Sequence, residues 1–341
     1  MTVPHFSPKV GDWVEVRSVA EILATLDADG DLEHMPCMPE MLKFTGQRFR
    51  ISAVAHKTCD TVNRTGGRTA RNAVHLEDLR CDGGAHGGCQ AACLIFWKTQ
   101  WLRRIPEPRP RDAAGSYAGA AASAAVESAS LMSHTSRDGI DGNLIYRCQA
   151  TTLPRWSGPL HWWDVRQYWR DIRCGNASVR HVLATLLLAA LRNLRRFSGG
   201  YRLSNWLYGP AHRWFRGTPD PHGTGTIRLN EKTPEARSDL RVGEVVEVRS
   251  RDEIYRTVNI QNRNRGLQID AEMTKYCGGR FRVASRVTRI INEQTGQMMH
   301  FKNPCIVLEG ADCMGEYSPM RLLCPRRITT YWREIWLRRV E

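Results

Sequence analysis

The two ends of this chain carry the same amino-acid pattern, and the repeat limits the possible folds more than any other feature. Residues 10–18 read VGDWVEVRS and residues 242–250 read VGEVVEVRS, an offset of 232 positions. The same offset aligns Cys81 with Cys313. The second copy then has three extra residues, and an offset of 235 aligns Trp97 with Trp332. Self-similarity over this length is typical of a duplicated structural unit, so we expect two copies of one module.

The first copy predicts a small module of short strands. Residues 10–17 alternate apolar and charged side chains, the period of a half-buried strand. Ser18 then begins a short helical stretch, and residues 27–30 are typical of a turn. Residues 48–51 and 74–76 predict further strands. The Val-Gly-Asp/Glu-x-Val-x-Val opening resembles the first strand of SH3-like barrels. We therefore expect an α+β fold with two small SH3-like β-barrel modules joined by a helical basic segment.

Composition divides the chain into five segments. The first module covers residues 9–104 and the second covers residues 239–341. Residues 105–143 are rich in Pro, Ala, Gly and Ser and cannot bury much apolar surface, so we expect a disordered linker there. Residues 144–217 form a central segment without a counterpart elsewhere in the chain. Residues 218–238, with several Pro and Gly residues, form a second linker.

The central segment is strongly basic. The chain has a net charge of +14, and seven arginines but no acidic residue lie between Gly175 and Thr218. Apolar residues recur with helical spacing over residues 179–197 and predict a helix. The segment could bind an anionic partner, namely nucleic acid, a membrane surface or an acidic protein, or it could pack its leucines on the modules while the arginines stay solvated. The residues expected to contact nucleic acid or a membrane are Arg192, Arg195, Arg196, Arg202, Trp206, Arg213 and Trp214.

Cellular location bears on how the cysteines are interpreted. Residues 1–8 show no basic stretch followed by an apolar run, so we expect no signal peptide. The longest apolar run, residues 182–191, is far shorter than the roughly 20 residues that cross a bilayer. We therefore expect a bacterial cytoplasmic protein without a transmembrane segment, with a peripheral membrane location as an alternative. Thiols stay reduced in that compartment, so clustered cysteines favour metal binding over disulfides.

Eight of the eleven cysteines fall into two groups of four, one group in each module. Only two pairs of positions, 81 with 313 and 89 with 324, are shared through the repeat. Two copies that reach four cysteines by different routes indicate a four-ligand metal site in each, although scattered buried thiols are the simpler alternative. The predicted metal ligands are Cys59, Cys81, Cys89 and Cys93 in the first module and Cys277, Cys305, Cys313 and Cys324 in the second.

The spacing of these cysteines favours iron–sulfur clusters over zinc. Structural zinc usually uses Cys-x-x-Cys pairs, and the chain contains none. Glycines around the first group and the Cys324-Pro325 pair are typical of iron–sulfur sites. We therefore expect two iron–sulfur clusters of the [4Fe–4S] type, with two zinc ions as the alternative. Any one of His56, His75 and His86 could replace a cysteine as a metal ligand. The three remaining cysteines, Cys37, Cys148 and Cys174, are expected to pack in cores.

Residues 56–60, 79–83, 86–89, 146–151 and 331–337 carry a resemblance to a protein family. On the strength of these residues, the whole chain outside the first linker resembles an uncharacterised bacterial family of cysteine-rich proteins with duplicated SH3-like modules. The resemblance implies a fold of duplicated SH3-like modules and a bacterial source. It also suggests a likeness to proteins of bacterial secondary metabolism, but it implies no activity.

No motif assigns an enzymatic reaction. The chain has no phosphate loop, dinucleotide fingerprint, Gly-x-Ser-x-Gly elbow or His-Glu-x-x-His pair, so whether it is an enzyme stays open. The leading hypothesis is an iron–sulfur protein for redox or sulfur transfer in a bacterial biosynthetic pathway. The alternatives are a zinc-stabilised nucleic-acid-binding protein and a peripheral membrane scaffold.

Overall fold

A computed structural model describes residues 6–107, 129–140, 142–194, 200–318 and 320–340, with side chains omitted for residues 200–205. The chain folds into two compact units. Unit 1 contains residues Met1–Ser178, Arg289–His300 and Leu323–Arg326, and unit 2 contains Val179–Thr288, Phe301–Leu322 and Arg327–Glu341. The central segment is therefore not a unit of its own, since the division falls between Ser178 and Val179.

Unit 1 is built on an open antiparallel sheet with the strand order β8-β7-β4-β1-β9. Alternation along the strands directs Val14, Val16, Ile51 and Leu76 into a core that also contains Trp101. Between the last two strands the chain makes one 3₁₀ turn, η1 (Thr99–Trp101). The strands are β1 (Trp13–Val16), β4 (Arg48–Val54), β7 (Ala73–Leu76), β8 (Trp97–Lys98) and β9 (Leu102–Ile105).

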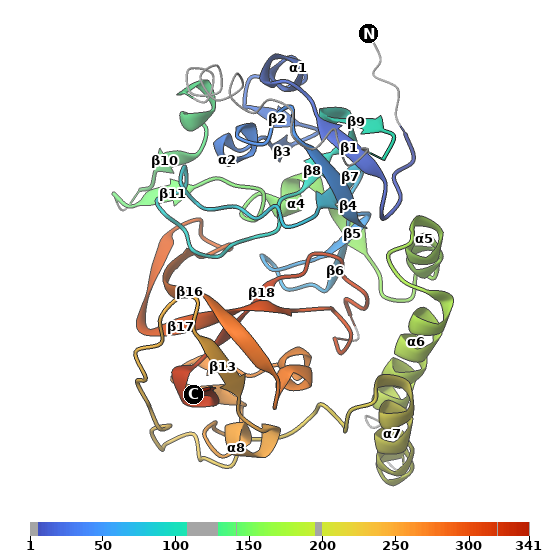
Figure 1. The fold of residues 1–341 in the computed structure, drawn as a ribbon, viewed down its shortest axis with the longest axis vertical. Helices are drawn as coiled ribbons and strands as arrows, with labels where there is room; N and C mark the ends of the chain where they lie inside the picture. Colours follow the sequence, from blue (N-terminus) through green and yellow to red (C-terminus); the bar gives the residue numbers. More distant parts are fainter. Residues whose placement is uncertain (1–5, 108–128, 141, 195–199, 319, 341) are drawn as a thin grey trace. The chain divides into compact units, whose positions relative to one another are not determined.

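Short elements surround this sheet (Figure 1). The predicted helix after the first strand is confirmed as α1 (Val19–Leu23), where the Ser18 side chain accepts from the Glu21 N–H and Glu21 bonds back to Ser18 in a capping box. The other elements of unit 1 are β2 (Asp31–Leu32), β3 (Met35–Pro36), α2 (Pro39–Leu42), β5 (Lys57–Cys59), β6 (Gly67–Thr69), β10 (Ser136–Asp138), β11 (Leu144–Tyr146), α4 (Leu153–Trp156), β12 (Gly158–Leu160) and α5 (Arg166–Cys174).

Unit 2 contains a second open sheet, with the order β18-β17-β16-β13-β19. Its core gathers Val246, Val248, Ile306, Trp332 and Trp336. The strands are β13 (Val245–Val248), β16 (Arg280–Ile291), β17 (Met298–Asp312), β18 (Thr329–Trp332) and β19 (Leu337–Arg339); residues 289–291 of β16 and 298–300 of β17 group with unit 1. The remaining elements are α6 (Val179–Leu194), α7 (Gly200–Arg216), α8 (Arg251–Tyr255), β14 (Arg263–Asn264), β15 (Leu267–Gln268), η3 (Ala271–Tyr276) and η4 (Glu334–Trp336).

The offsets read from the sequence recur as equivalent hydrogen bonds and strand pairs. Residue 14 pairs with residue 49 in the first copy, and residue 246 pairs with residue 281 in the second. The Trp101 indole donates to Thr25 Oγ1 at 3.0 Å, and the Trp336 indole donates to Thr257 Oγ1 at 2.9 Å. The described part of the chain contains no sheet that closes on itself, so the expected closed barrels are not seen. The mixed α+β class is confirmed.

The expected linkers are only partly within the structure. Residues 108–128, most of the predicted disordered linker, lie outside the described residues. The end of that segment forms β10, which pairs with β11. The predicted helix from residue 179 is confirmed as α6. No helix in the described ranges has the length and apolar character needed to cross a membrane.

Candidate metal centre and cationic pocket

A glycine-rich loop between β7 and β8 brings several thiols together in unit 1. The Cys81 N–H donates to the Cys93 carbonyl at 2.8 Å and closes residues 81–93 into a loop. Gly83 lies in this loop with φ +70, and a Cβ there would lie 2.0 Å from the Cys89 carbonyl oxygen. Only glycine fits that position. The sequence therefore folds the loop so that Cys81, Cys89 and Cys93 face one small cavity.

The cavity has a volume of about 40 Å³ and is lined by four cysteines. The fourth is Cys148, whose N–H is fixed by Thr151 Oγ1 at 2.9 Å. Most of the remaining lining is apolar, from residues 91, 92, 94–96 and 291 among others, and the buried guanidinium of Arg326 also reaches it. The Ile291 N–H donates to Cys89 Sγ at 3.3 Å. A backbone donor and a nearby cation both favour the thiolate form that binds metal.

Without a metal, burial disfavours the thiolate form of three of these cysteines. Burial raises the pKa of Cys93 to about 12. Burial also raises the pKa of Cys81, and the nearby Glu40 charge adds to the effect. The pKa of Cys148 is raised by burial as well. A bound cation reverses this preference, because it stabilises the thiolates that burial disfavours.

Three different ligand types converge beside this cavity. Glu40 from α2, Cys81 and His86 place ligand atoms within 4.8 Å of one another, the one such group of three or more in the described residues. Glu40 Oε1 lies 2.6 Å from His86 Nδ1 and accepts the Ala85 N–H at 3.0 Å. Glu40 and His86 are 6% and 2% exposed. Glu40 Oε2 is also buried, and no hydrogen-bond partner for it occurs among the described residues.

The hydrogen bonds of His86 restrict its protonation state. His86 Nε2 lies 3.1 Å from the Arg147 carbonyl, which can only accept, so Nε2 carries a proton. Nδ1 then either carries a second proton and pairs with Glu40 as imidazolium, or offers its lone pair to a cation. Burial alone would raise the pKa of Glu40, but the hydrogen bond and charge of His86 outweigh it and hold that pKa below its ordinary value. The site therefore holds a positive charge, a proton or a metal, between these two side chains.

The predicted quartets are only partly brought together. Cys81, Cys89 and Cys93 line one cavity, whereas the cavity lining does not include Cys59, which is buried on β5. In the second quartet Cys324 groups with unit 1, and Cys277, Cys305 and Cys313 group with unit 2. Cys305 lies 3.6 Å from the Arg333 guanidinium.

The remaining histidines and cysteines have local partners. His56 Nε2 lies 2.8 Å from Asp171 Oδ1, and His75 Nδ1 lies 2.9 Å from the Ile95 carbonyl. Cys37 is part of the core of unit 1, and Cys148 and Cys174 pack against it, as expected for all three.

The second copy keeps part of the triad. Glu272, equivalent to Glu40, accepts the Tyr317 N–H at 2.7 Å, as Glu40 accepts the equivalent Ala85 N–H. Cys313 is equivalent to Cys81, but Ser318 stands where His86 would be. Burial raises the pKa of Glu272 to about 7. The two equivalent carboxyls thus have opposite pKa shifts, because only the first has an imidazole beside it.

Two of these residues were missed from the sequence. Cys148 packs against the core of unit 1 as expected, but its place in the cavity lining was not foreseen, because it lies far along the chain from the cysteine loop. Glu40 gave one usable signal, since the repeat matches it with Glu272. Acidic residues are rare at buried positions, and here one occurs at the same buried position in both copies.

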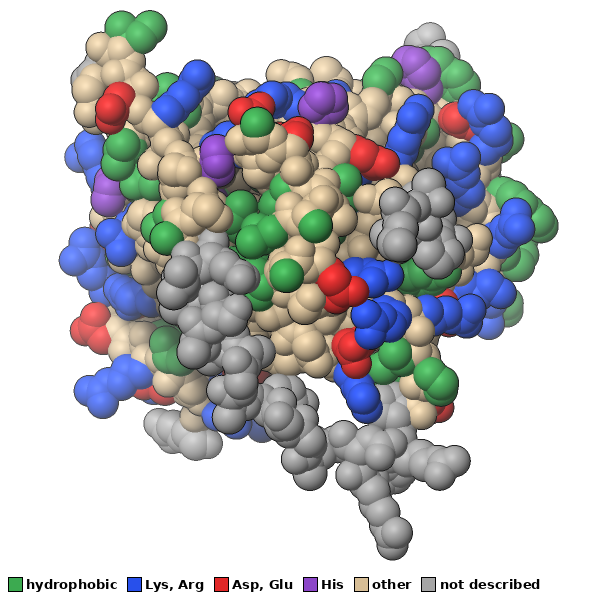
Figure 2. Space-filling model, turned by 90° about the horizontal axis from the view of Figure 1, so that it is seen from above, with side chains coloured by type: hydrophobic (Ala, Val, Ile, Leu, Met, Phe, Trp, Pro, Cys, Tyr) green, Lys and Arg blue, Asp and Glu red, His purple; other side chains and the backbone are tan. Residues whose placement is uncertain are grey.

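Five of the seven predicted contact residues of the central segment lie on α6 or α7, which pack against each other in unit 2. Trp206 and Trp214 are 72% and 80% exposed, and Arg213 is exposed as well. Arg192 instead donates to the Tyr317 carbonyl. Arg195 and Arg196 lie outside the described residues, and the side chain of Arg202 is not described. On the face drawn in Figure 2, Lys and Arg side chains are spread widely, with Asp and Glu among them.

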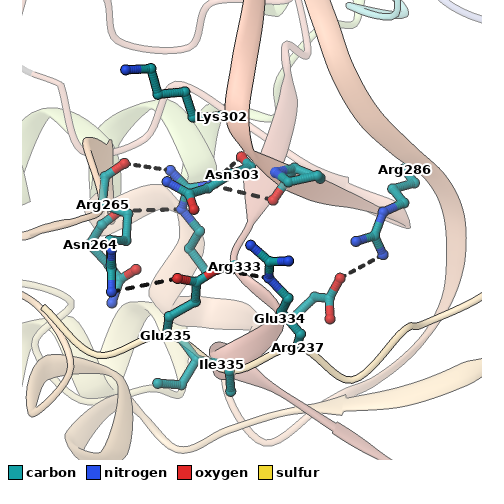
Figure 3. Close-up of a pocket in the computed structure, with 12 residues that line it drawn as sticks. Glu235, Arg237, Asn264, Arg265, Arg286, Lys302, Asn303, Arg333, Glu334 and Ile335 are labelled. Atoms are coloured by element: carbon teal, nitrogen blue, oxygen red, sulfur yellow. Dashed lines mark hydrogen bonds and ion pairs between the residues drawn. The ribbon is translucent and has the colours of Figure 1, made fainter.

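A second pocket, of about 240 Å³, lies within unit 2 (Figure 3). Its charged lining comprises Arg237, Arg265, Arg286, Lys302, Arg333, Glu235 and Glu334. Five cationic side chains and two carboxylates therefore line the pocket.

The chain was also compared with known proteins. No protein-family model, curated protein sequence or solved structure matches it.

Proposed function

We propose that this protein binds a transition-metal ion in unit 1, through Glu40, Cys81 and His86 together with a thiol of the adjoining cavity. The observation that carries the proposal is the convergence of three ligand types within 4.8 Å at a buried site. The unpartnered Glu40 Oε2 supports it, since a buried carboxylate oxygen without a donor is costly. A mixed oxygen, nitrogen and sulfur set suits Zn²⁺. The Arg147 carbonyl would accept a hydrogen bond from His86 Nε2 and so fix the orientation of the ring, as partners of metal-bound histidines do.

An iron–sulfur cluster is the second candidate, favoured by the four cysteines on one cavity. This set replaces Cys59 of the expected quartet with Cys148. The apolar lining and the Ile291 N–H bond to Cys89 suit such a cluster. With a cluster the protein would serve redox or sulfur transfer in a bacterial biosynthetic pathway, whereas a zinc ion would stabilise the unit. The quartet of Cys277, Cys305, Cys313 and Cys324 stays a prediction.

Metal analysis after oxygen-free purification tests both candidates. A zinc site predicts a colourless protein with zinc that is lost in Glu40→Gln and His86→Ala. A cluster predicts a brown protein with iron and absorbance near about 400 nm that is lost in Cys148→Ser. Cys174→Ser is the matched control, because it removes a thiol away from the cavity and should retain the metal. Protein without metal, or full metal content in His86→Ala and Cys148→Ser alike, would overturn the proposal.

We further infer that both sheets descend from an SH3-like module. The equal strand orders, the equivalent registers and the single 3₁₀ turn before each last strand support this inference. It predicts that a solved structure of either unit will superpose strand for strand on the other at the offsets of the sequence repeat.

We propose that α6 and α7 bind an anionic membrane surface. Leu183 and Leu187 are 62% and 45% exposed one turn apart on α6, and Trp206 and Trp214 are exposed on α7. Residues 179–216 contain no Asp or Glu. Exposed leucines and tryptophans beside arginines suit a lipid interface, whereas nucleic acid would not cover leucines.

Vesicle co-sedimentation tests this partner. The protein should pellet with phosphatidylserine vesicles, and the Leu183→Glu/Leu187→Glu double variant should not. Ile260→Glu, which changes an exposed apolar residue elsewhere in unit 2, should pellet like the parent. Retention on nucleic acid without vesicle binding would favour the alternative of a nucleic-acid-binding protein.

A further inference from the structure

The cationic pocket of unit 2 has more positive charge than its own acids can neutralise. Glu334 pairs with Arg286 at 2.6 Å and also accepts the Ser238 and Asp239 backbone N–H groups. Glu235 pairs with Arg237 at 2.9 Å and lies 3.5 Å from Arg265.

Two cations of the pocket have no carboxylate partner within the described part of the chain. Arg333 is only 8% exposed and donates to backbone carbonyls, those of Asn264 at 3.2 Å, Arg265 at 2.7 Å and Asn303 at 2.6 Å. The Lys302 ammonium makes no hydrogen bond or ion pair with any described residue, and Figure 3 shows it apart from the other charged side chains. Carbonyl dipoles satisfy the Arg333 donors. The charge of Glu235 also acts on Arg333, but this carboxylate is shared with Arg237 and Arg265, so the buried positive charge is only partly compensated.

The first copy supplies an internal comparison. Lys98 is equivalent to Arg333 and is 1% exposed. It donates to the Arg71 carbonyl at 3.2 Å, just as Arg333 donates to the equivalent carbonyl of residue 303. Lys98 also forms an ion pair with Glu33 at 2.6 Å.

In the second copy Arg265 stands where Glu33 stands in the first. The same scaffold has therefore exchanged the neutralising carboxylate for another cation. A protein gains no stability from placing a second guanidinium beside a buried one, so an external anion is the natural counter-charge.

We propose that this pocket is a binding site for a small phosphate-bearing molecule, with Arg265, Lys302 and Arg333 supplying the positive charge. Phosphate fits because it brings up to two negative charges, and the planar guanidinium bonds its oxygens in pairs. The volume of about 240 Å³ lies below the range of about 300–1,000 Å³ that is usual for drug-sized ligands. A compact phosphorylated metabolite is therefore the class of ligand that suits it.

The test restores the charge arrangement of the first copy. Binding of inorganic phosphate, pyrophosphate and citrate to the full-length protein is measured by calorimetry, for the parent and for Arg265→Glu. Because a hydrogen bond to a charged group contributes strongly, affinity for pyrophosphate should fall about 10-fold or more in Arg265→Glu. Lys302→Gln should weaken binding in the same direction. Arg241→Glu, with the same change of charge at an exposed position outside the pocket, should bind like the parent.

Each result decides the proposal. Pyrophosphate binding that is lost in Arg265→Glu and kept in Arg241→Glu supports it, and Arg265→Gln distinguishes lost attraction from added repulsion. Three results would overturn it: no binding of either phosphate probe at millimolar concentration, tighter binding of citrate than of both phosphates, or equal weakening by Arg241→Glu. Circular dichroism of each variant confirms that the fold is retained.

Discussion

Replacing Glu272 by glutamine should stabilise the protein above neutral pH. Glu272 is 2% exposed and its Oε2 has no hydrogen-bond partner in the described ranges. Burial raises its pKa from 4.5 to about 7. Each pKa unit corresponds to about 1.4 kcal/mol, so the folded state is penalised by on the order of 3 kcal/mol when the carboxyl is ionised in both states.

The direction of the effect follows from which state ionises first. Below pH 4.5 the carboxyl is protonated in both states, so it contributes no difference. Between pH 4.5 and about 7 the unfolded carboxyl ionises while the folded one keeps its proton, and stability falls as the pH rises. Above that window the loss is complete. Glutamine keeps the oxygen that accepts the Tyr317 N–H and removes the ionisation.

Urea denaturation near pH 5 and near pH 8, with a chelator present to exclude metal, measures this effect. The Glu272→Gln variant should differ little from the parent near pH 5, at the lower end of this window, and exceed it clearly near pH 8. Glu40→Gln at the equivalent position should instead lower the free energy of unfolding by about 1.5–3 kcal/mol at neutral pH, because His86 then lacks its charged partner. A Glu272→Gln variant that is destabilised near pH 8, or a pH profile parallel to that of the parent, would refute the reasoning.

Three further substitutions test contacts within unit 1 by denaturation. Asn176→Ala should cost about 1–3 kcal/mol, because the Asn176 amide bonds both the N–H and the carbonyl of Val54 at 2.8 and 2.9 Å. Asp171→Asn should cost about 3–5 kcal/mol, since this fully buried carboxylate pairs with two basic side chains. Burial alone would raise the pKa of Asp171, but these partners hold it below its ordinary value, so its contribution should vanish as the pH falls through the folded pKa. Gln149→Leu should cost about 1–3 kcal/mol by leaving the Phe96 N–H and carbonyl, bonded at 2.9 and 2.8 Å, without partners.

The repeat allowed much of the local structure to be predicted. Alternation and the Ser18 cap depend on neighbouring residues, so β1 and α1 could be read from a short window. The helical spacing after residue 178 likewise predicted α6. The equal offsets then extended each interpretation from one copy to the other.

The candidate site was harder to predict because its residues come from distant parts of the chain. Cys148 reaches the cavity of the cysteine loop from β11 and its following turn, and Glu40 reaches it from α2. Nothing in the sequence near either residue marks that approach. The closed barrel was expected from one strand pattern, and a strand pattern gives pairing partners without saying whether the outermost strands meet.

The interleaving of the two units along the chain has a consequence for synthesis. Unit 1 includes residues 289–300 and 323–326, so the Arg326–Glu293 ion pair and the Ile291–Cys89 bond form within it. Residue 326 has to be synthesised before the interior of unit 1 can be complete. The N-terminal part of unit 1 therefore cannot finish folding until nearly all of unit 2 has been synthesised. For the same reason, recombination at a single linker cannot transfer either unit intact to another protein.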